Sequence, residues 1–94
     1  MTEYKLGEFV TATSGKDKDK IYIIINTTEE YVYLVDGVFR SINNPKRKNR
    51  KHVVSLSFRD QSLLKKWENN SKVIDEEIKR AIKIYKQNIK NELV

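Results

Sequence analysis

Residues 21–42 read IYIIINTTEEYVYLVDGVFRSI and contain the pattern that decides the fold. Residues 21–26 form a β-branched and aromatic run that is too short for a helix and too apolar to be exposed on both faces, so they predict a strand. Residues 31–35 alternate between tyrosines and aliphatic residues, which predicts a second strand. The Asp36-Gly37 pair follows. Because Asp-Gly favours a two-residue hairpin turn, residues 38–42 are predicted to form a third strand paired with the second.

Two further strands are predicted outside this stretch. Residues 10–13 alternate between apolar residues and Thr, and a glycine-containing turn with alternating charges follows at residues 14–20. Residues 43–45, Asn-Asn-Pro, end the strand predicted before them, and residues 52–56 predict a last short strand. Five short strands with close turns in about fifty residues suggest a small SH3-like barrel, which we assign to residues 1–57.

Residues 58–94 are predicted to form a helical tail, so the expected fold class is mainly β with two C-terminal helices. Asp60 is expected to cap a short helix that ends at residues 69–71, and Asp75 to cap a second helix over residues 76–91. The apolar positions of the second helix form a single stripe of Ile78, Ala81, Ile82, Tyr85, Ile89 and Leu93. Three roles are open for this stripe: packing on the first helix or the barrel, docking a partner, or lying on a membrane surface.

The composition excludes several kinds of chemistry. The 94 residues contain no Cys, which rules out disulfides, thiolate nucleophiles and Cys-ligated metal sites. The single histidine, His52, rules out a multi-His metal site. There is no G-x-S-x-G motif and no glycine-rich phosphate loop, and the adjacent acids at residues 75–77 suit a helix N-terminus. We therefore expect no enzyme activity, no cofactor, no metal and no small-molecule substrate. An enzyme acting on RNA is the remaining minor alternative.

The apolar runs are short, and the first ten residues contain acids and no hydrophobic region typical of a signal peptide. The sequence therefore predicts a single cytoplasmic domain that does not span a membrane. With 38% hydrophobic and 34% charged residues, its core is expected to be small.

The net charge of +6 is concentrated in one short segment. Residues 1–45 have a net charge of −2, residues 53–94 of +3, and residues 46–52, KRKNRKH, of +5. A basic run of this density usually contacts a polyanion, because each Lys or Arg placed on a phosphate releases a condensed counterion. The alternative is a solvated loop without a partner.

The candidate RNA-binding residues are the bases and amides of this run and of its neighbourhood. Arg binds phosphate through two donors and stacks on bases, whereas Lys acts as a point charge. Tyr22, Tyr31 and Tyr33 are candidates for stacking on unpaired bases, or else fill the core or the strand surface. The candidate residues are Lys16, Lys18, Lys20, Arg40, Asn44, Lys46, Arg47, Lys48, Asn49, Arg50, Lys51 and His52. If the barrel closes, the loop at residues 16–20 and the basic run are expected to lie near each other.

Two segments carry a resemblance to a known family. Residues 6–20, LGEFVTATSGKDKDK, lead into the apolar run at residues 21–25 and look like a KOW motif, which is a strand, a glycine-containing loop and a second strand. Further on, the order YLVDG, Arg40, NPKRKN and Lys51-His52 is similar to the bacterial KOW-domain RNA-binding proteins. These proteins are related to the 14e-type large-subunit ribosomal proteins of archaea and eukaryotes. The resemblance covers roughly residues 4–56.

The resemblance implies an SH3-like barrel whose loops bind RNA, chiefly ribosomal RNA, with ribosomal proteins as further neighbours. Carried over by position, the contacts are the loop at residues 15–20 and the segment at residues 46–52. One departure is Asp19, where family members often have a second glycine. The alternative function is a protein-interaction adaptor, in which the barrel or the C-terminal helix docks a translation or transcription factor.

Overall fold

The computed structural model describes residues 3–92. Its elements are, in chain order, the strand β1 (Glu8–Ala12), the 3₁₀ turn η1 (Gly15–Asp17), β2 (Ile21–Thr27), β3 (Tyr31–Val35), β4 (Lys46–Asn49), the 3₁₀ turn η2 (Arg50–His52), β5 (Val53–Arg59), and the helices α1 (Gln61–Glu68) and α2 (Asp75–Glu92). The expected five strands and two helices are present. The helices contain nearly as many residues as the strands, so the fold is mixed rather than mainly β.

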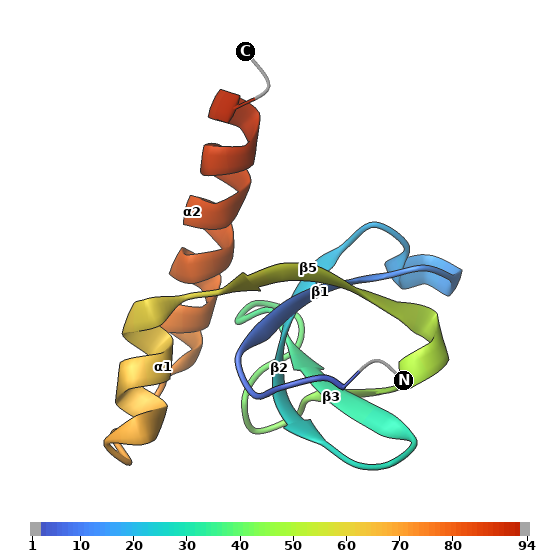
Figure 1. Ribbon diagram of the computed structural model, residues 1–94, viewed down its shortest axis with the longest axis horizontal. Helices are drawn as coiled ribbons and strands as arrows, with labels where there is room; N and C mark the ends of the chain where they lie inside the picture. The colour runs from blue at the N-terminus through green and yellow to red at the C-terminus, as the bar shows by residue number, and fades with distance from the viewer. Residues whose placement is uncertain (1–2, 93–94) are drawn as a thin grey trace.

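The strands form one antiparallel sheet in the order β4-β3-β2-β1-β5, with both helices to one side of it (Figure 1). Within residues 3–92 the sheet ends at β4 and at β5, which are its two edge strands. The turn η2 joins these edges along the chain. Backbone hydrogen bonds tie η2 to both halves of the sheet, from the N–H of Arg50 to the carbonyl of Glu30 and from the N–H of Thr13 to the carbonyl of His52.

Both faces of the sheet are buried, which explains why residues 21–26 are apolar in every position but the last. Tyr22 and Ile24 point to one face, where they pack with Val10, Val32 and other residues of what we call the sheet core. Its members are Tyr4, Val10, Tyr22, Ile24, Val32, Leu34 and Val53. Ile23 points to the opposite face, toward the helices. This alternation follows the two-residue period of a strand.

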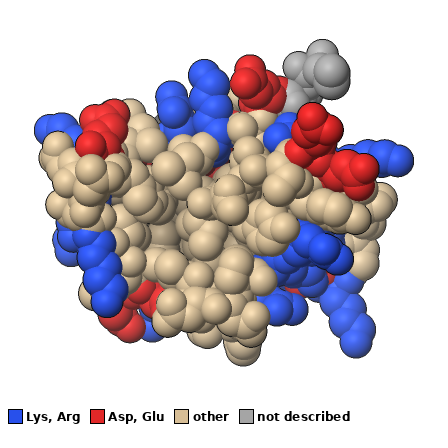
Figure 2. All heavy atoms as spheres, turned by 90° about the horizontal axis from the view of Figure 1, so that it is seen from below, with Lys and Arg blue, Asp and Glu red and all other residues tan. Residues whose placement is uncertain are grey.

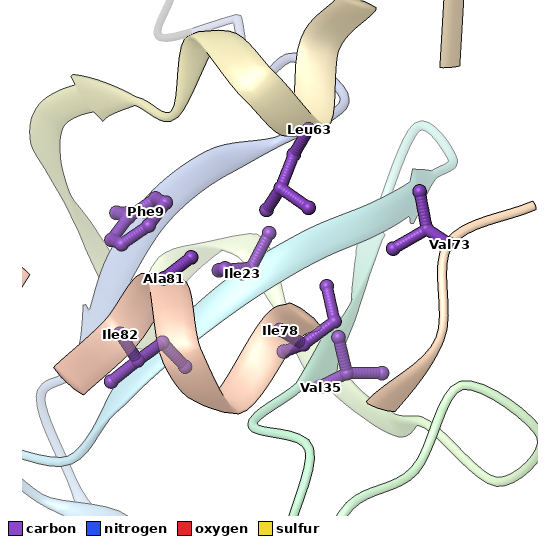
Figure 3. Packing of buried hydrophobic residues seen from close by; sticks show 8 residues of the cluster. All are labelled: Phe9, Ile23, Val35, Leu63, Val73, Ile78, Ala81 and Ile82. Atoms are coloured by element: carbon purple, nitrogen blue, oxygen red, sulfur yellow. The ribbon is translucent and has the colours of Figure 1, made fainter. Parts of the chain in front are cut away.

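The second cluster, which we call the helix-side core, lies between the sheet and the helices (Figure 3). It consists of Phe9, Ile23, Val35, Leu63, Val73, Ile78, Ala81 and Ile82. Ile78, Ala81 and Ile82 come from the apolar stripe of α2, and Tyr85 packs against the same cluster. The sheet therefore covers these four positions of the stripe. Leu93, the last position of the predicted stripe, lies outside the described residues.

The helix termini agree with the prediction at one position and differ at the other. The carboxylate of Asp60 accepts a hydrogen bond from the N–H of Leu63 at 3.0 Å, which is the expected N-cap. Asp75 was predicted to cap α2, but its Oδ1 instead accepts the N–H of Ile42 at 2.8 Å. At the start of α2 the N–H of Ile74 donates to Glu77 at 3.2 Å. The carboxylate of Asp75 therefore ties the segment after β3 to the helix.

The predicted strand at residues 38–42 is wrong. Asp36 Oδ1 accepts the N–H groups of Val38 and Arg40 at 2.9 and 2.8 Å, which closes a compact turn in place of a hairpin. Gly37 has a φ of +80° and lies against the backbone of α2, where a Cβ would come within 2.4 Å of the Asp75 carbonyl oxygen. The conformation of this segment is therefore set by the hydrogen bonds to the Asp36 carboxylate and by the packing of Gly37 against α2.

The fourth strand is the basic run itself, where the sequence predicted a loop. β4 pairs with β3 through Tyr31↔Asn49, Val32↔Lys48, Tyr33↔Arg47 and Leu34↔Lys46. A strand this rich in charge suits a sheet edge, where lysines discourage pairing with other chains. The last strand begins at Val53 and extends to Arg59, three residues beyond the predicted end.

Candidate nucleic-acid interface

The register of β4 divides the basic run between two faces. Lys46 and Lys48 stand opposite Leu34 and Val32 and therefore lie on the face of the sheet core. Arg47 and Asn49 stand opposite the tyrosines of β3 and lie on the other face. Neighbouring cations of the run consequently have different surroundings and different roles.

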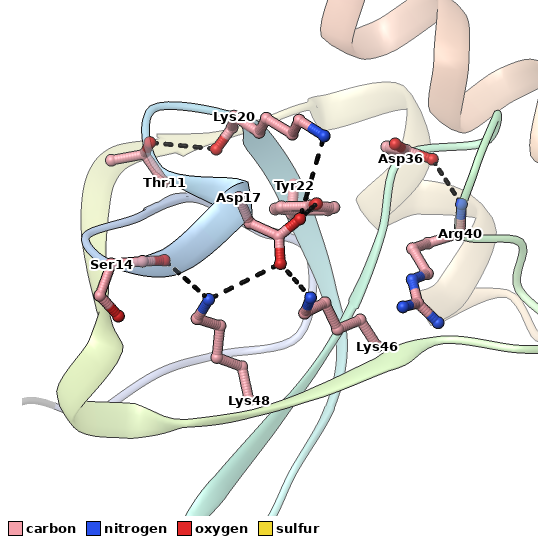
Figure 4. Close-up of polar contacts among 9 residues, drawn as sticks. All are labelled: Thr11, Ser14, Asp17, Lys20, Tyr22, Asp36, Arg40, Lys46 and Lys48. Atoms are coloured by element: carbon pink, nitrogen blue, oxygen red, sulfur yellow. Dashed lines mark hydrogen bonds and ion pairs between the residues drawn. The ribbon is translucent and has the colours of Figure 1, made fainter.

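On the first face, Lys46 and Lys48 converge on Asp17 of η1 (Figure 4). Lys46 forms an ion pair with Asp17 Oδ2, and Lys48 Nζ lies 3.7 Å from the same oxygen while donating to the Ser14 carbonyl at 3.2 Å. Lys20 Nζ is 4.0 Å from Asp17 Oδ1. The two basic segments thus lie side by side, as expected, and a carboxylate holds them together.

Asp17 is only 9% exposed and stays ionised at neutral pH. The hydrogen bond from Lys46, together with the one from Tyr22, holds the pKa of its carboxyl below the usual range. The Tyr22 hydroxyl donates to Asp17 Oδ1 at 3.0 Å, and burial followed by this carboxylate raises the pKa of Tyr22. Tyr22 is therefore part of the sheet core and is not free to stack on a base.

On the second face, Arg47 covers the ring of Tyr31. Its guanidinium carbon lies 4.6 Å from the ring centroid, and the Arg47 side chain is exposed, while Tyr31 and its neighbour Tyr33 are half-buried. A guanidinium on an aromatic face keeps its N–H donors free at the edge, where they can meet a phosphate. This arrangement places an exposed guanidinium that can bind phosphate against an aromatic ring, on the edge strand β4.

The turn η2 extends this surface. Arg50 is partly committed to the fold, because its Nε donates to the Thr28 carbonyl at 2.7 Å and its guanidinium lies 5.7 Å from the ring centroid of Tyr4. Asn49 Oδ1 accepts the N–H of Lys51 at 2.9 Å and caps the turn. The side chains of Lys51 and His52 are exposed.

The other candidate residues are more scattered. Lys16 and Lys18 are exposed around η1. Arg40 is half-buried in the turn after β3, and Asn44 is exposed in the turn before β4. Asp19 has a φ of +67° and donates its N–H to the Ala12 carbonyl at 3.0 Å. It therefore adopts the left-handed conformation that a glycine would take at this position.

The charged side chains are unevenly spread over the surface. Seen from below the view of Figure 1, uncharged side chains cover the centre of the face, and Lys and Arg gather at its margins (Figure 2). Over residues 3–92 no group of three His, Asp or Glu side chains is arranged to hold a metal ion. In the same range no helix is long and apolar enough to cross a membrane.

One surface was missed by the sequence interpretation. A groove of about 550 Å³ runs between α2 and the turn that follows β3. The signal for it was present, because Lys79, Lys83, Lys86 and Lys90 recur at helical spacing and so share a face of α2. The apolar partners of that face come from the turn, and no pattern in the sequence indicated that the turn folds back onto the helix.

Comparison with known proteins does not assign the chain to a family. It matches no family model, and no curated protein matches its sequence.

Proposed function

We propose that the protein is an RNA-binding module that recognises structured RNA through the edge of the sheet formed by β3, β4 and η2, together with the turn η1 beside it. The observation that carries the proposal is the exposed Arg47 stacked on Tyr31 at the edge of the sheet, with the exposed Lys51 four residues further along the chain. Stacking on aromatic rings and charge-assisted contacts to phosphate are the two general components of single-strand and loop recognition in RNA. The proposed activity is binding and not catalysis.

The resemblance described above supports a more specific target. KOW-domain proteins with an SH3-like barrel chiefly bind ribosomal RNA. We therefore propose large-subunit ribosomal RNA as the ligand, in the cytoplasm and with ribosomal proteins nearby. The chain would act as a ribosomal-type component or as an assembly or translation factor. An SH3-like barrel is compatible with the sheet order and with the burial of both sheet faces.

The cations of residues 46–52 do not all contribute equally to phosphate binding. The single negative charge of Asp17 offsets part of the charge of Lys46 and Lys48, so they contribute less to RNA affinity than their positions in the sequence suggest. We assign the phosphate contacts to Arg47, Lys51 and the two exposed lysines of the η1 region, Lys16 and Lys18. Four such contacts give a slope of log affinity against log salt of about −2.8 to −3.6, at about 0.7–0.9 per phosphate.

The test measures the affinity of the full chain for a fluorescently labelled ribosomal RNA hairpin over a series of salt concentrations. Arg47→Ala and Lys51→Ala should each weaken binding and each reduce the salt slope by about 0.7–0.9. Lys65→Ala, which removes an exposed lysine from α1, is the matched control and should leave the slope unchanged. A salt-independent affinity, or a slope that Arg47→Ala does not alter, contradicts the proposal.

The adaptor function remains a second candidate. One observation favours it, the groove beside α2, part of whose lining is formed by the apolar side chains of Ile21, Val38, Phe39 and Ile82.

A further inference from the structure

The groove beside α2 has an apolar floor. Ile21 and Ile82 contribute from β2 and α2, and Val38 and Phe39 contribute from the turn after β3. Phe39 is 84% exposed and Val38 is 57% exposed. Two large apolar side chains exposed next to each other in a hollow are typical of an interaction surface.

This exposure is built into the fold. Asp36 holds the turn through the N–H groups of Val38 and Arg40, and Asp75 holds its far end through the N–H of Ile42. Gly37 packs directly on the backbone of α2. The turn therefore holds the backbone at Phe39 in place, so binding of a ligand would not have to order this part of the chain.

The rim of the groove is strongly basic. It is formed by Lys20, Lys79, Lys83, Lys86 and Lys90. The four lysines of α2 extend over about 16 Å at 1.5 Å per residue, and none of them forms an ion pair with a carboxylate among the described side chains, those of residues 3–90. The acid that lines the groove, Asp36, already accepts two backbone N–H groups. The potential over the groove is therefore positive, and the charge lacks a partner within the described chain.

We propose that this groove binds an acidic peptide segment of a partner protein, with bulky apolar side chains on the floor and carboxylates on the lysine rim. Charge complementarity selects an acidic ligand. Three of the four floor side chains are aliphatic and offer neither a flat surface for a base nor a group for a base edge, which favours a peptide over RNA; Phe39 is the exception. The site is separate from the Arg47–Tyr31 surface, and the proposal does not depend on RNA binding.

The experiment uses the full chain and a fluorescein-labelled peptide of about 14 residues, with Leu and Phe along one helical face and Glu elsewhere. Fluorescence anisotropy should show saturable binding. Phe39→Ala, and separately the double variant Lys83→Glu with Lys86→Glu, should each weaken it by about tenfold or more. A peptide of the same composition with its apolar face scrambled should bind at least about fivefold more weakly.

The matched controls change similar side chains elsewhere on the surface. Val54→Ala removes an exposed apolar side chain of β5, and Lys65→Glu with Lys72→Glu reverses two exposed charges, and both should leave the peptide affinity within about twofold. Arg47→Ala should lower RNA affinity and leave peptide affinity unchanged, which separates the two proposals.

Three results would overturn this assignment: no saturable binding of the peptide to the wild type at about 1 mM, equal binding of the scrambled peptide, or a loss of RNA affinity in Phe39→Ala with unchanged peptide affinity. The last result would assign the groove to the nucleic acid, because this substitution leaves the charge as it is.

Discussion

At the scale of single residues, Asp17 decides how much of the basic run is available to a ligand. It is nearly buried, it forms an ion pair with Lys46, it lies close to Lys48, and it accepts the hydroxyl of Tyr22. A run that is uniform in sequence is thereby divided into cations that hold the fold and cations that face solvent. The carboxylate also offsets part of the repulsion between these two neighbouring lysines on one strand face.

Asp17→Asn should lower the free energy of unfolding by about 1.5–3 kcal/mol at pH 7, because the variant keeps the shape but loses the charge that Lys46 contacts. The pKa of Asp17 is lowered in the folded state. Its stabilising contribution is therefore complete above its unfolded pKa, near 4, and is lost as the pH falls through the lower folded value. Urea unfolding from pH 7 to pH 2 should show the curves of wild type and variant converging toward acid.

Asp19→Asn is the control for this measurement. It removes the same charge from the same turn, and Asn tolerates the positive φ of that position. Because Asp19 is exposed, the control should change stability by less than about 0.5 kcal/mol. A pH-independent difference between Asp17→Asn and wild type would show that the ion pair does not stabilise the fold.

The sequence shows where the positive charge lies, but it does not show which of these cations are paired within the fold and which face solvent. The concentration of positive charge in residues 46–52 is visible in the sequence, whereas the proximity of the η1 loop was conditional on closure of the barrel. The separate roles of Lys46 and Arg47 depend on β4 being a strand in a particular register with β3. A run of five bases in seven residues shows no strand signal, so this information was not in the local pattern.

At the scale of the elements, the turn after β3 shows how a local signal is overridden. Asp36-Gly37 has the composition of a hairpin turn, yet the Asp36 carboxylate binds two N–H groups within the turn and Gly37 fits against α2. The Asp60 cap, by contrast, was predicted correctly, because it depends only on residues three positions apart. The cap predicted at Asp75 depended on an equally local signal and was wrong, because the Asp75 carboxylate accepts the N–H of Ile42 from the turn. A local signal therefore held only where no distant element competed for the side chain.

Gly37→Ala should destabilise the protein by about 2–4 kcal/mol. The new Cβ would come within 2.4 Å of the Asp75 carbonyl oxygen and 2.7 Å of the Lys79 nitrogen, and the residue has a φ of +80°. Since backbone atoms of a helix cannot move aside cheaply, the turn should separate from α2. Urea unfolding measures the loss, and anisotropy with the acidic peptide should show weaker binding to the groove.

Gly15→Ala separates the effect of the steric clash with α2 from the effect of the positive φ. Gly15 has a similar φ of +75°, but a Cβ there would meet nothing within 4 Å. This variant should therefore lose only the backbone preference of glycine, about 1–2 kcal/mol. If both variants lose the same amount, the close approach of the turn to the helix does not contribute to stability.

At the scale of the whole molecule, the sheet and the helical tail share one of the two clusters, the helix-side core. The helix-side core contains Phe9, Ile23 and Val35 from three strands and Ile78 from α2, and each of these four side chains is 0% exposed. The division at residue 57 that the composition suggests is therefore not a boundary between two cores. A small domain with this many charged residues needs the helix to bury one face of its sheet.

Ile78→Ala tests this coupling. Removing a fully buried Ile should lower the free energy of unfolding by about 2–5 kcal/mol, because it combines lost transfer energy with a cavity. If sheet and helices unfold together, the free energy of opening measured by hydrogen exchange should fall by this same amount for the amides of β2 and of α2. The reason is that both sets of amides then exchange through global unfolding. Ile84→Ala, on the same helix but 41% exposed, should cost less than about 1 kcal/mol and serves as the control. Loss of protection in α2 with β2 unchanged would mean that the helix opens independently, and the groove beside it would then be presented by a separable element instead of a fixed part of the fold.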